Sequence, residues 1–574
     1  MIVQKKLMYL FLLLAFLGLG CQFTRLTPTQ TPAILPSPTP THTPEPLKPE
    51  TATPISVPTP TPVPDQPTAT PGPKATPKPI DVSQENILRL WSQDPETLDP
   101  AITQDSTSHQ FVSLLFSGLV KLDANLNVVG DLAERWEIDA TGTVYTFYLH
   151  KNAKFHNGRQ VTAQDVLYSF ERACNPKRGS VQRAQSYLND IVGVMARTMG
   201  ESGSIEGLKA VDDFTVQITI DAPKPYFLAK LTYPTSYIVC KENVEDAKRN
   251  WLASPIGSGP FMVEKNAANE MVLAAFDEYY LGRPKLDKVV FEYRGSTMNM
   301  YERGELDVIE VGAANIDRVL DPNDPLHQDL RIVSQLDVWY IGFNASLPPF
   351  DDVHVRRAFA YATNKQAIAD IVFNKTVIPA NGILPPGMPG YNPDLEGIPF
   401  DPDMALEEMV ESDYGDASEL PPITLTVTGA EFGETLAAMY LQVLGVEVEV
   451  EVVDWGVFLS GLDTQKYQMY SLGWIADYPD PQNFLDLLFH STSAYNHGAY
   501  SNLELDALVE EARVEQDYDA RMALYQQAEE LLVNDVPWIP IYHSGGYYLV
   551  KSYVKGLVIT GQDTMNLADV SLEE

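Results

Sequence analysis

Positive charge is scarce in this chain. Against 77 Asp and Glu residues it carries only 40 Lys and Arg, which gives a formal net charge of −37. Nucleic acid and anionic membrane surfaces would repel such a protein, so neither is expected as its main partner. The same charge allows weak attraction of cationic ligands, which salt would screen, although solubility alone also explains an acidic surface.

Signature motifs of the common enzyme classes are missing as well. The sequence has no Gly-x-Ser-x-Gly elbow, no His-Glu-x-x-His, no Walker A loop and no glycine-rich dinucleotide turn. Its histidines form no spaced cluster of metal ligands. We therefore predict no catalytic residue, no metal and no cofactor. A secreted hydrolase remains a remote alternative, because the two carboxylates of a glycosidase are paired only in space.

The apolar run at the N-terminus is short for a membrane span. Lys5 and Lys6 precede the run at residues 7–20, which is typical of the apolar region of a secretory signal peptide. The residues Gly-Leu-Gly-Cys that end at Cys21 resemble a lipobox, although Gly18 stands where the pattern usually has Leu. We expect residues 1–21 to be a lipoprotein signal peptide with Cys21 as the lipidated residue. An ordinary cleaved signal is the alternative.

Proline and threonine dominate the next segment. Residues 27–79 contain runs such as SPTPTHTPEP and VPTPTPVP and few apolar residues to bury. Proline fixes the backbone, so residues 22–84 are expected to form an extended, disordered stalk with a reach of up to ~160 Å at about 3.1 Å per residue. The composition also suits O-glycosylation. Stalk and anchor together predict a receptor on the outer face of the cytoplasmic membrane.

Cysteine is rare, with three residues in the whole chain. With Cys21 assigned to lipid, Cys174 and Cys240 remain, far apart in sequence and each beside apolar residues. In an exported protein such a pair is compatible with a disulfide. Two buried, unpaired thiols are the ordinary alternative, and the sequence leaves both open.

After the stalk the chain reads as mixed α and β, and its length predicts two or three lobes. A β-hairpin is expected around the turn 139–142, followed by a helix that Thr162 caps with Asp165 in its first turn. Alternating or continuous apolar runs predict further strands at residues 85–91, 215–220, 271–276, 288–293, 306–311, 337–344, 424–427 and 446–453. Helical periodicity predicts helices at residues 110–120, 226–231 and 355–373 and one that begins at Gly433.

Residue identity adds more than these patterns. The segment GDLAERWEIDATGTVYTFYLHKNAKFHNGRQVTAQDVLYSFERA, residues 130–173, resembles the signature segment of the family 5 extracellular solute-binding proteins, the peptide receptors of ABC importers. Three further segments resemble the family in the same order, and the likeness covers roughly residues 86–560. They are IGSGPFMVEKN, YIGFNASLPPFDDVHVRRAFAYATNKQAI and GWIADYPDPQNFLDLLFHS.

The resemblance implies an α/β fold of the two-lobed type II periplasmic-binding class, with an extra subdomain as in the large peptide binders. A discontinuous domain I would comprise residues 85–123, 212–295 and 542–574. Residues 124–211 would form the extra subdomain, and residues 296–541 domain II. Crossings near Gly295 and Tyr542 would then serve as the hinge between the lobes.

The resemblance also implies a ligand site. Peptide-binding members accept the α-ammonium of the ligand on the Asp that matches Asp477, which could instead form a simple Asx-turn before Tyr478. The ligand-binding residues that it implies are Asp477, Trp474, Ile475, Trp455, Tyr542 and Tyr187. Each aromatic residue of this set could equally belong to the core.

One departure concerns the carboxylate of the ligand. Family members that bind oligopeptides often hold it with cations, but the matching places here are Ser471 and Ala360. Arg356 and Arg357 are the substitutes that the sequence offers, at the start of a predicted helix. The expected function is nevertheless that of a monomeric receptor that delivers peptides to an ABC permease. The alternative ligands are oligosaccharides and metal chelates.

Overall fold

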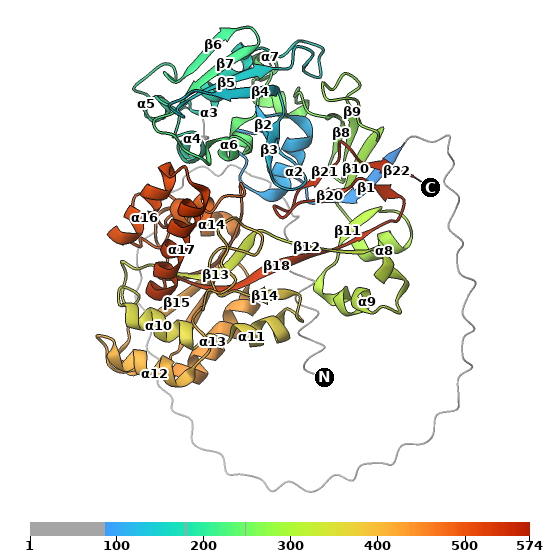
Figure 1. The fold of residues 1–574 in the computed structure, drawn as a ribbon. Coiled ribbons are helices and arrows are strands. Elements are labelled where there is room, and N and C mark those ends of the chain that lie inside the picture. Colours follow the sequence, from blue (N-terminus) through green and yellow to red (C-terminus); the bar gives the residue numbers. More distant parts are fainter. Residues whose placement is uncertain (1–85, 178–180, 247, 574) are drawn as a thin grey trace, which may run out of the picture. The chain divides into compact units, whose positions relative to one another are not determined.

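Two β-sheets organise the part of the chain that the structure describes (Figure 1). The computed structural model describes residues 86–177, 181–246 and 248–573. The expected signal peptide, Cys21 and the stalk at residues 22–84 lie outside these ranges. Among the helices of the described residues, none combines the length and the apolar character needed to cross a membrane.

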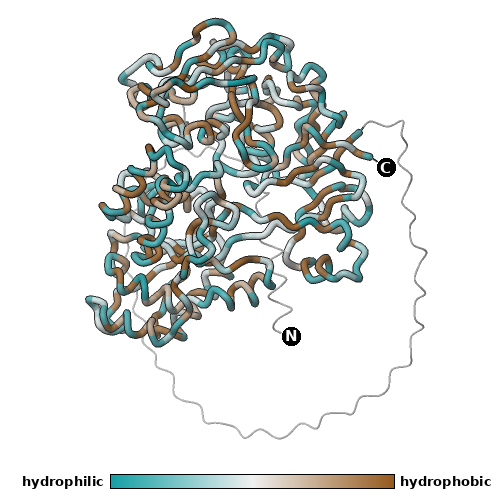
Figure 2. Tube along the Cα trace, viewed as in Figure 1, coloured by the Kyte–Doolittle hydropathy of each residue, from teal (hydrophilic) through white to brown (hydrophobic). Residues whose placement is uncertain are grey.

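The larger sheet runs through both halves of the described chain. Most of its strands follow one path, in the spatial order β16 (Val448–Val452), β15 (Ile423–Val427), β17 (Met469–Ile475), β13 (Asp337–Phe343), β18 (Trp538–Val550), β11 (Val308–Glu310), β1 (Ile87–Trp91), β10 (Lys288–Glu292), β9 (Glu270–Ala275) and β8 (Phe261–Ala267). β12 (Leu330–Ser334) and β14 (Val377–Pro379) pair with β18 off this path. Figure 2 shows apolar stretches along these strands and polar residues in the peripheral loops.

Strand β18 belongs to both halves of this sheet. Residues 538–542 pair with β13, whereas residues 545–550 pair with β11 and β12. We call the part built on β1 and β8–β12 the first lobe and the part built on β13–β17 the second lobe. β18 is therefore one of the connections between the lobes.

A four-stranded sheet belongs to the first lobe. Its order is β4 (Ala133–Ile138), β5 (Val144–Leu149), β7 (Thr215–Thr219) and β6 (Leu208–Asp212). The expected hairpin is confirmed, because β4 and β5 pair in antiparallel fashion. The expected cap is also present, because Thr162 and Asp165 form a capping box at the start of α3.

The helices surround these sheets (Figure 1). The first lobe carries α2 (Ser106–Leu115), α3 (Ala163–Ala173), α4 (Val181–Tyr187), α5 (Val194–Thr198), α6 (Phe227–Lys230), α7 (Lys241–Asp246), α8 (Thr297–Glu302) and α9 (Ile316–Leu320). The second lobe carries α10 (Val353–Tyr361), α11 (Lys365–Ala367), α12 (Pro402–Glu411), α13 (Ala430–Leu444), α14 (Trp455–Asp463), α15 (Leu487–Phe489), α16 (Leu503–Val514) and α17 (Tyr518–Asp535).

Two helix predictions need correction. The helix expected at residues 110–120 begins earlier, because Asp105 caps α2 by accepting the backbone N–H of Ser108 at 2.8 Å. The long helix expected at residues 355–373 ends at Tyr361. Asn364 then starts a new helical turn by accepting the N–H of Ala367 at 2.9 Å. In both places a short polar side chain caps a helix and sets where it begins, which the apolar periodicity alone does not predict.

Strand pairing groups two segments near the expected domain boundaries, and the boundaries themselves stay a prediction. The segment at residues 297–334, expected in domain II, packs in the first lobe, because β11 pairs with β1 and its apolar side chains cluster around Leu549. With the lobes defined by their strands, the chain passes from the first lobe to the second between β12 and β13, near Gln335. Strand β7 belongs to the four-stranded sheet although it lies beyond the expected boundary at residue 211.

A buried carboxylate with two lysines joins the loop after α4 to α6. Asp190, which is 2% exposed, accepts the ammonium of Lys230 and, at 2.6 Å, that of Lys224. Burial alone would raise the pKa of Asp190, but the two lysines hold that pKa below its usual value. Removing one member of such a group leaves uncompensated buried charge.

Asp190→Asn should therefore lower the free energy of unfolding by about 3 kcal/mol, the usual cost of breaking a buried ion pair. Asp221→Asn is the matched control, because Asp221 also pairs with Lys224 but has a side chain that is 56% exposed. Its effect should stay below about 1 kcal/mol. Urea unfolding of both variants measures the difference, and equal effects would contradict this interpretation of the cluster.

Candidate functional site

The site begins where strand β17 ends. Trp474 and Ile475 are the last two residues of the strand, and they pair with Val338 and Asp337 on β13. Successive strand residues point to opposite faces, so the two side chains face opposite sides of the sheet. Asp477 follows in the loop that leads to a short π-helical segment, Gln482–Asp486.

Asn483 fixes this loop from the inside. Its side-chain oxygen accepts the N–H of Asp477 at 3.0 Å and the indole N–H of Trp474 at 3.1 Å. Its amide nitrogen donates to Oδ2 of Asp477 at 3.0 Å. Asn483 is fully buried, so these contacts are shielded from water. The position of the carboxylate is thus set by a side chain of its own lobe.

The first lobe reaches the same carboxylate. Tyr187, at the end of α4, donates its hydroxyl to Oδ2 of Asp477. The Tyr187 ring stacks on Tyr233 with centroids 3.7 Å apart, and Tyr478 meets it edge-on at 6.3 Å. These three tyrosines form a buried cluster, which we call the tyrosine wall. Two of its members come from the first lobe and one from the second.

The C-terminal segment adds a further contact between the lobes. The side-chain amide of Gln562 donates to the carbonyl of Asp477 at 2.8 Å and to that of Ala476 at 3.0 Å. Gln562 lies in the turn between β20 (Val558–Ile559) and β21 (Met565–Asn566). The loop of Asp477 is therefore held from three directions.

The electrostatic state of Asp477 is unusual. Burial raises its pKa to about 6, and the hydrogen bonds from Tyr187 and Asn483 only partly oppose this effect. Among the described residues, no Lys or Arg forms an ion pair with Asp477. A desolvated carboxylate without a cation gains more from an incoming ammonium group than an exposed one does.

Trp474 supports the site through its neighbours. Its ring meets Tyr495 edge-on, with centroids 5.6 Å apart. Tyr495 in turn shares a side-chain hydrogen bond with Ser186, the residue before Tyr187 on α4. Three predicted residues, Asp477, Trp474 and Tyr187, thus lie in one constellation, with Ile475 next to it in the chain.

Trp455 and Tyr542 are placed elsewhere. Trp455 starts α14, is 46% exposed and stacks on Phe458. Tyr542 lies on β18 in the apolar core of the second lobe, where it packs against Trp339 and Phe373. The prediction that both line the ligand site stays a prediction.

Several residues of this site escaped the sequence analysis. They are Tyr233, Tyr478, Asn483, Tyr495 and Gln562, which come from distant parts of the chain. A further residue is Trp339, an indole on a central strand that is nevertheless 39% exposed and lies against Gly473. Only Tyr478 and Asn483 had a usable signal, because they lie one and six positions after Asp477 within the recognisable motif.

The expected substitutes for the missing cations are already engaged. Arg356 is buried, and its guanidinium donates to the backbone carbonyls of Phe350, Asp535 and Val536. Arg357 donates to the carbonyl of Asn534 at 2.9 Å. Both arginines therefore serve the C-terminal end of α17, and neither replaces the cations absent at Ser471 and Ala360.

Comparison with known proteins identifies the family. The family model described as bacterial extracellular solute-binding proteins, family 5 middle, matches residues 127–496. The dipeptide-binding protein DppE of Bacillus subtilis is 30% identical over 503 residues, which cover 83% of this chain and 90% of that relative. The chain belongs to the family 5 extracellular solute-binding proteins. This family binds solutes, so the hydrolase alternative is dropped.

Two further likenesses define the fold and the range of the family. The structure of the murein tripeptide-binding protein MppA of Escherichia coli superposes with a TM-score of 0.75 at 26% identity, covering 86% of this chain and 99% of that one. A probable deoxycholate-binding periplasmic protein of Escherichia coli, YgiS, is 30% identical over 81% of this chain and 89% of its own length. The type II periplasmic-binding fold predicted from sequence is confirmed.

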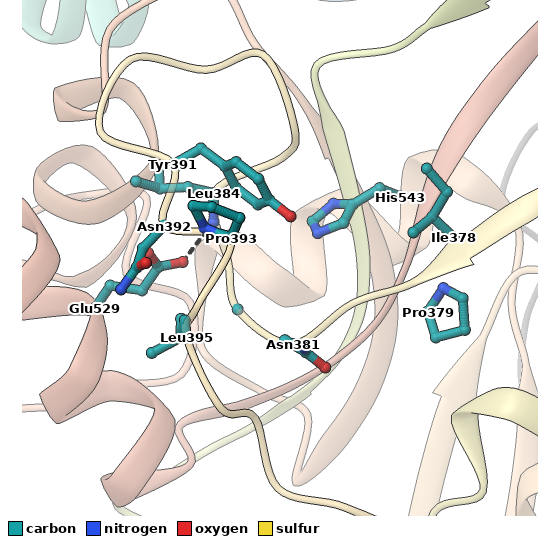
Figure 3. A pocket seen from close by; sticks show the side chains of 11 residues that line it. Ile378, Pro379, Asn381, Leu384, Tyr391, Asn392, Pro393, Leu395, Glu529 and His543 are labelled. Carbon is teal, nitrogen blue, oxygen red and sulfur yellow. Dashed lines mark hydrogen bonds between the residues drawn. The ribbon is translucent and has the colours of Figure 1, made fainter.

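A small pocket in the second lobe is unsuited to a peptide. It lies beside β18 and contains about 30 Å³, room for a water molecule or two. In Figure 3 the Glu529 carboxyl bonds the N–H of Leu384, and the Tyr391 hydroxyl points toward His543. Burial raises the pKa of Glu529 to about 7. Its size makes this pocket part of the core packing.

The two remaining cysteines answer an open question from the sequence. Cys174 and Cys240 are both buried and both free. Of the two alternatives, the unpaired thiols are therefore the ones that the structure shows.

Asp477→Asn should change how the stability of the ligand-free protein depends on pH. Because burial raises the pKa of Asp477 to about 6, the native protein keeps this proton to a higher pH than the unfolded chain, whose Asp has a pKa of about 4. The contribution of Asp477 to stability should thus fall as pH rises from about 4 to about 6. Urea midpoints of the wild type and the variant across this range measure it. A constant difference would contradict the raised pKa.

Proposed function

We propose that this protein captures peptides between its two lobes and delivers them to the permease of an ABC importer. The observation that carries the proposal is Asp477, a part-buried carboxylate that pairs with no cation among the described residues, at the place where side chains of both lobes meet. The relatives support the ligand class, since DppE is named for dipeptides and MppA for a murein tripeptide.

The chemistry of the carboxylate suits an α-ammonium group. Oδ2 of Asp477 accepts two neutral donors, from Tyr187 and Asn483. An ammonium group would add a charged donor, and a hydrogen bond between ions is about twice as strong as one between neutral groups. The fixed loop would orient the amine before the rest of the peptide is bound.

The tyrosine wall supports tolerance for different side chains. Aromatic rings offer wide apolar contact with polar hydroxyls at their edges, and such contact depends little on the shape of the partner. Tyr187 and Tyr233 are stacked and buried, so they form a rigid support beside the Asp477 carboxylate. A site of this kind would select the amine terminus strongly and the side chains weakly.

The two connections between the lobes would act as the hinge when the lobes close. One is the segment near Gln335 between β12 and β13, and the other is the middle of β18. Asp337 ties them together, because its carboxylate accepts the N–H of Ser544 at 2.7 Å and its carbonyl bonds the His543 ring at 2.7 Å. A ligand that contacts both lobes would shift the population toward the closed form.

A non-peptide solute is the second candidate. YgiS, named for deoxycholate, is as similar to this chain as DppE is. Oligosaccharides and metal chelates belong to the same alternative. Such ligands would not require an acid that accepts an ammonium group, so the role of Asp477 separates the two candidates.

For the segments outside the described residues we keep the sequence-based proposal. The extracellular family agrees with export. Lipidation of Cys21 would hold the receptor, as a monomer on its stalk, at the outer face of the cytoplasmic membrane.

Native mass spectrometry of the purified protein should show co-purifying masses in the range of peptides. In Asp477→Asn these masses should decrease at least about tenfold, because one charge-assisted contact is lost. Asp394→Asn, an exposed Asp of the same lobe, is the control and should retain them. Unchanged peptide occupancy in Asp477→Asn would refute its role, and a single non-peptide mass would favour the second candidate.

Cys21→Ala should release the full-length protein from membranes, because the lipid chains that anchor it are then missing. Cell fractionation with an antibody against the folded part measures the distribution. Retention of the variant on the membrane would rule out Cys21 as the anchor.

A further inference from the structure

The two lobes also meet at a place beside the loop of Asp477. Tyr226 precedes α6 in the first lobe and is 2% exposed, and Arg521 on α17 of the second lobe is 4% exposed. The guanidinium carbon of Arg521 lies 5.6 Å from the centroid of the Tyr226 ring. Helix α6 lies on the side of the first lobe that faces α16 and α17 (Figure 1). A buried contact between an aromatic ring and a cation therefore joins the lobes.

The first lobe supplies this ring with a cation of its own. The ammonium nitrogen of Lys230, one helical turn after Tyr226, lies 5.7 Å from the same centroid. Lys230 is held in place by Asp190 and by the side-chain oxygen of Asn189, the latter at 2.7 Å. The face of an aromatic ring attracts cations within about 6 Å, and more strongly where water is excluded. One ring thus interacts with a cation from each lobe.

Arg521 connects this contact to the candidate ligand site. Its guanidinium donates to Oδ1 of Asp480 and, at 3.2 Å, to the carbonyl of Ala512. Asp480 lies three positions after Asp477, is 8% exposed and accepts the N–H of Gln482 at 3.0 Å. The loop of Asp477 is therefore linked, through Asp480 and Arg521, to an aromatic ring of the first lobe.

A hydrogen bond joins the same two segments a few residues away. The side-chain amide of Gln516, in the turn between α16 and α17, donates to the carbonyl of Pro223 at 3.0 Å. It also donates to the carbonyl of Val514 at 2.7 Å, so its position is fixed within the second lobe. Pro223 lies three residues before Tyr226. The segment that leads into α6 therefore contacts the second lobe twice, once through a buried ring and once through an exposed hydrogen bond.

We propose that these four residues, Tyr226, Arg521, Pro223 and Gln516, form a clasp that stabilises the closed arrangement of the lobes without a ligand. Movement of the lobes away from each other breaks both contacts. Arg521 keeps Asp480 when the lobes separate, because both belong to the second lobe. The clasp thus acts on the equilibrium between open and closed forms and leaves the ion pair within the second lobe intact. This inference goes beyond the proposed function, because it holds whichever solute is bound.

The clasp would set the affinity for every ligand by a common factor. A ligand that binds only the closed form has an apparent dissociation constant equal to its intrinsic value divided by the fraction of closed protein. Contacts that close the empty receptor raise this fraction before the ligand arrives. Specificity would then come from the groups around Asp477, and the clasp would contribute affinity without choosing between ligands.

Single-molecule energy transfer between the lobes measures the equilibrium directly. Full-length protein that carries Cys21→Ala is labelled at Lys209→Cys in the first lobe and Glu407→Cys in the second, two exposed positions. The native Cys174 and Cys240 are buried, which protects them from the dyes. Unfolding in guanidinium chloride and refolding in fresh buffer removes co-purified ligand. The ratio of closed to open molecules is then read for each variant.

Tyr226→Leu should lower this ratio about tenfold, because the cation loses its aromatic partner in a dry contact. Tyr226→Phe keeps the ring and should behave as the wild type. Gln516→Glu replaces the donor by an acceptor that faces the Pro223 carbonyl, and it should lower the ratio at least about twofold. Gln527→Glu is the matched control, because the Gln527 amide is exposed and bonds only the Ala523 carbonyl of its own helix.

A wild type that is open after removal of ligand would overturn the clasp, as would an unchanged ratio in Tyr226→Leu. Equal losses in Tyr226→Phe and Tyr226→Leu would show that the ring is not the stabilising element. If Tyr226→Leu does not refold, Gln516→Glu decides, since its side chain is exposed, and a ratio equal to that of Gln527→Glu refutes the proposal. These results are independent of the ligand class, which the Asp477→Asn experiment tests separately.

Discussion

The desolvation of one carboxylate organises the ligand region of this protein. Asp477 is partly buried, and this desolvation raises its pKa to about 6 although the neutral donors Tyr187 and Asn483 oppose the rise. Such a group is unfavourable in the empty receptor and favourable once a cation arrives. The surrounding contacts, from Asn483 within the loop and from Tyr187 and Gln562 across the lobes, keep the carboxylate in place although it lacks a partner. An ammonium group is the partner that this carboxylate would favour under the proposed function.

The same constraint explains why the site is assembled from both lobes. Asp477 of the second lobe is covered in part by the tyrosine wall, which comes mainly from the first lobe. Closure of the lobes would therefore also bury the Asp477 carboxylate. Asp337, at the start of β13, hydrogen-bonds to Ser544 on β18, so the two connections between the lobes are joined to each other. Movement of one connection would therefore move the other. In such a receptor the ligand shifts the population from the open to the closed form, and a permease could distinguish the two forms.

The sequence predicted local features correctly and did not predict contacts between segments that are far apart in the chain. The hairpin around residues 139–142 and the cap at Thr162 depend on neighbours, and both were predicted correctly. Asp477, Trp474 and Tyr187 came from family resemblance, and the structure brings them together. No local sequence motif points to Tyr233 or Gln562, because their contacts form only when segments hundreds of residues apart meet in the fold. The passage between the lobes near Gln335 follows from strand pairing, which no local turn signal in the sequence marks.

The distribution of charge within the site then limits what the protein can select. Under the proposed function, Asp477 of the second lobe would hold the amine terminus of a ligand, and the aromatic rings around it would contact the rest. Fixed charges discriminate sharply, because a misplaced or missing partner leaves an ion desolvated. Apolar rings discriminate weakly between side chains of similar size. Selection of the amine terminus with tolerance for the side chains is the behaviour that the proposed peptide receptor requires, and in the proposed site Asp477 would supply the selective part.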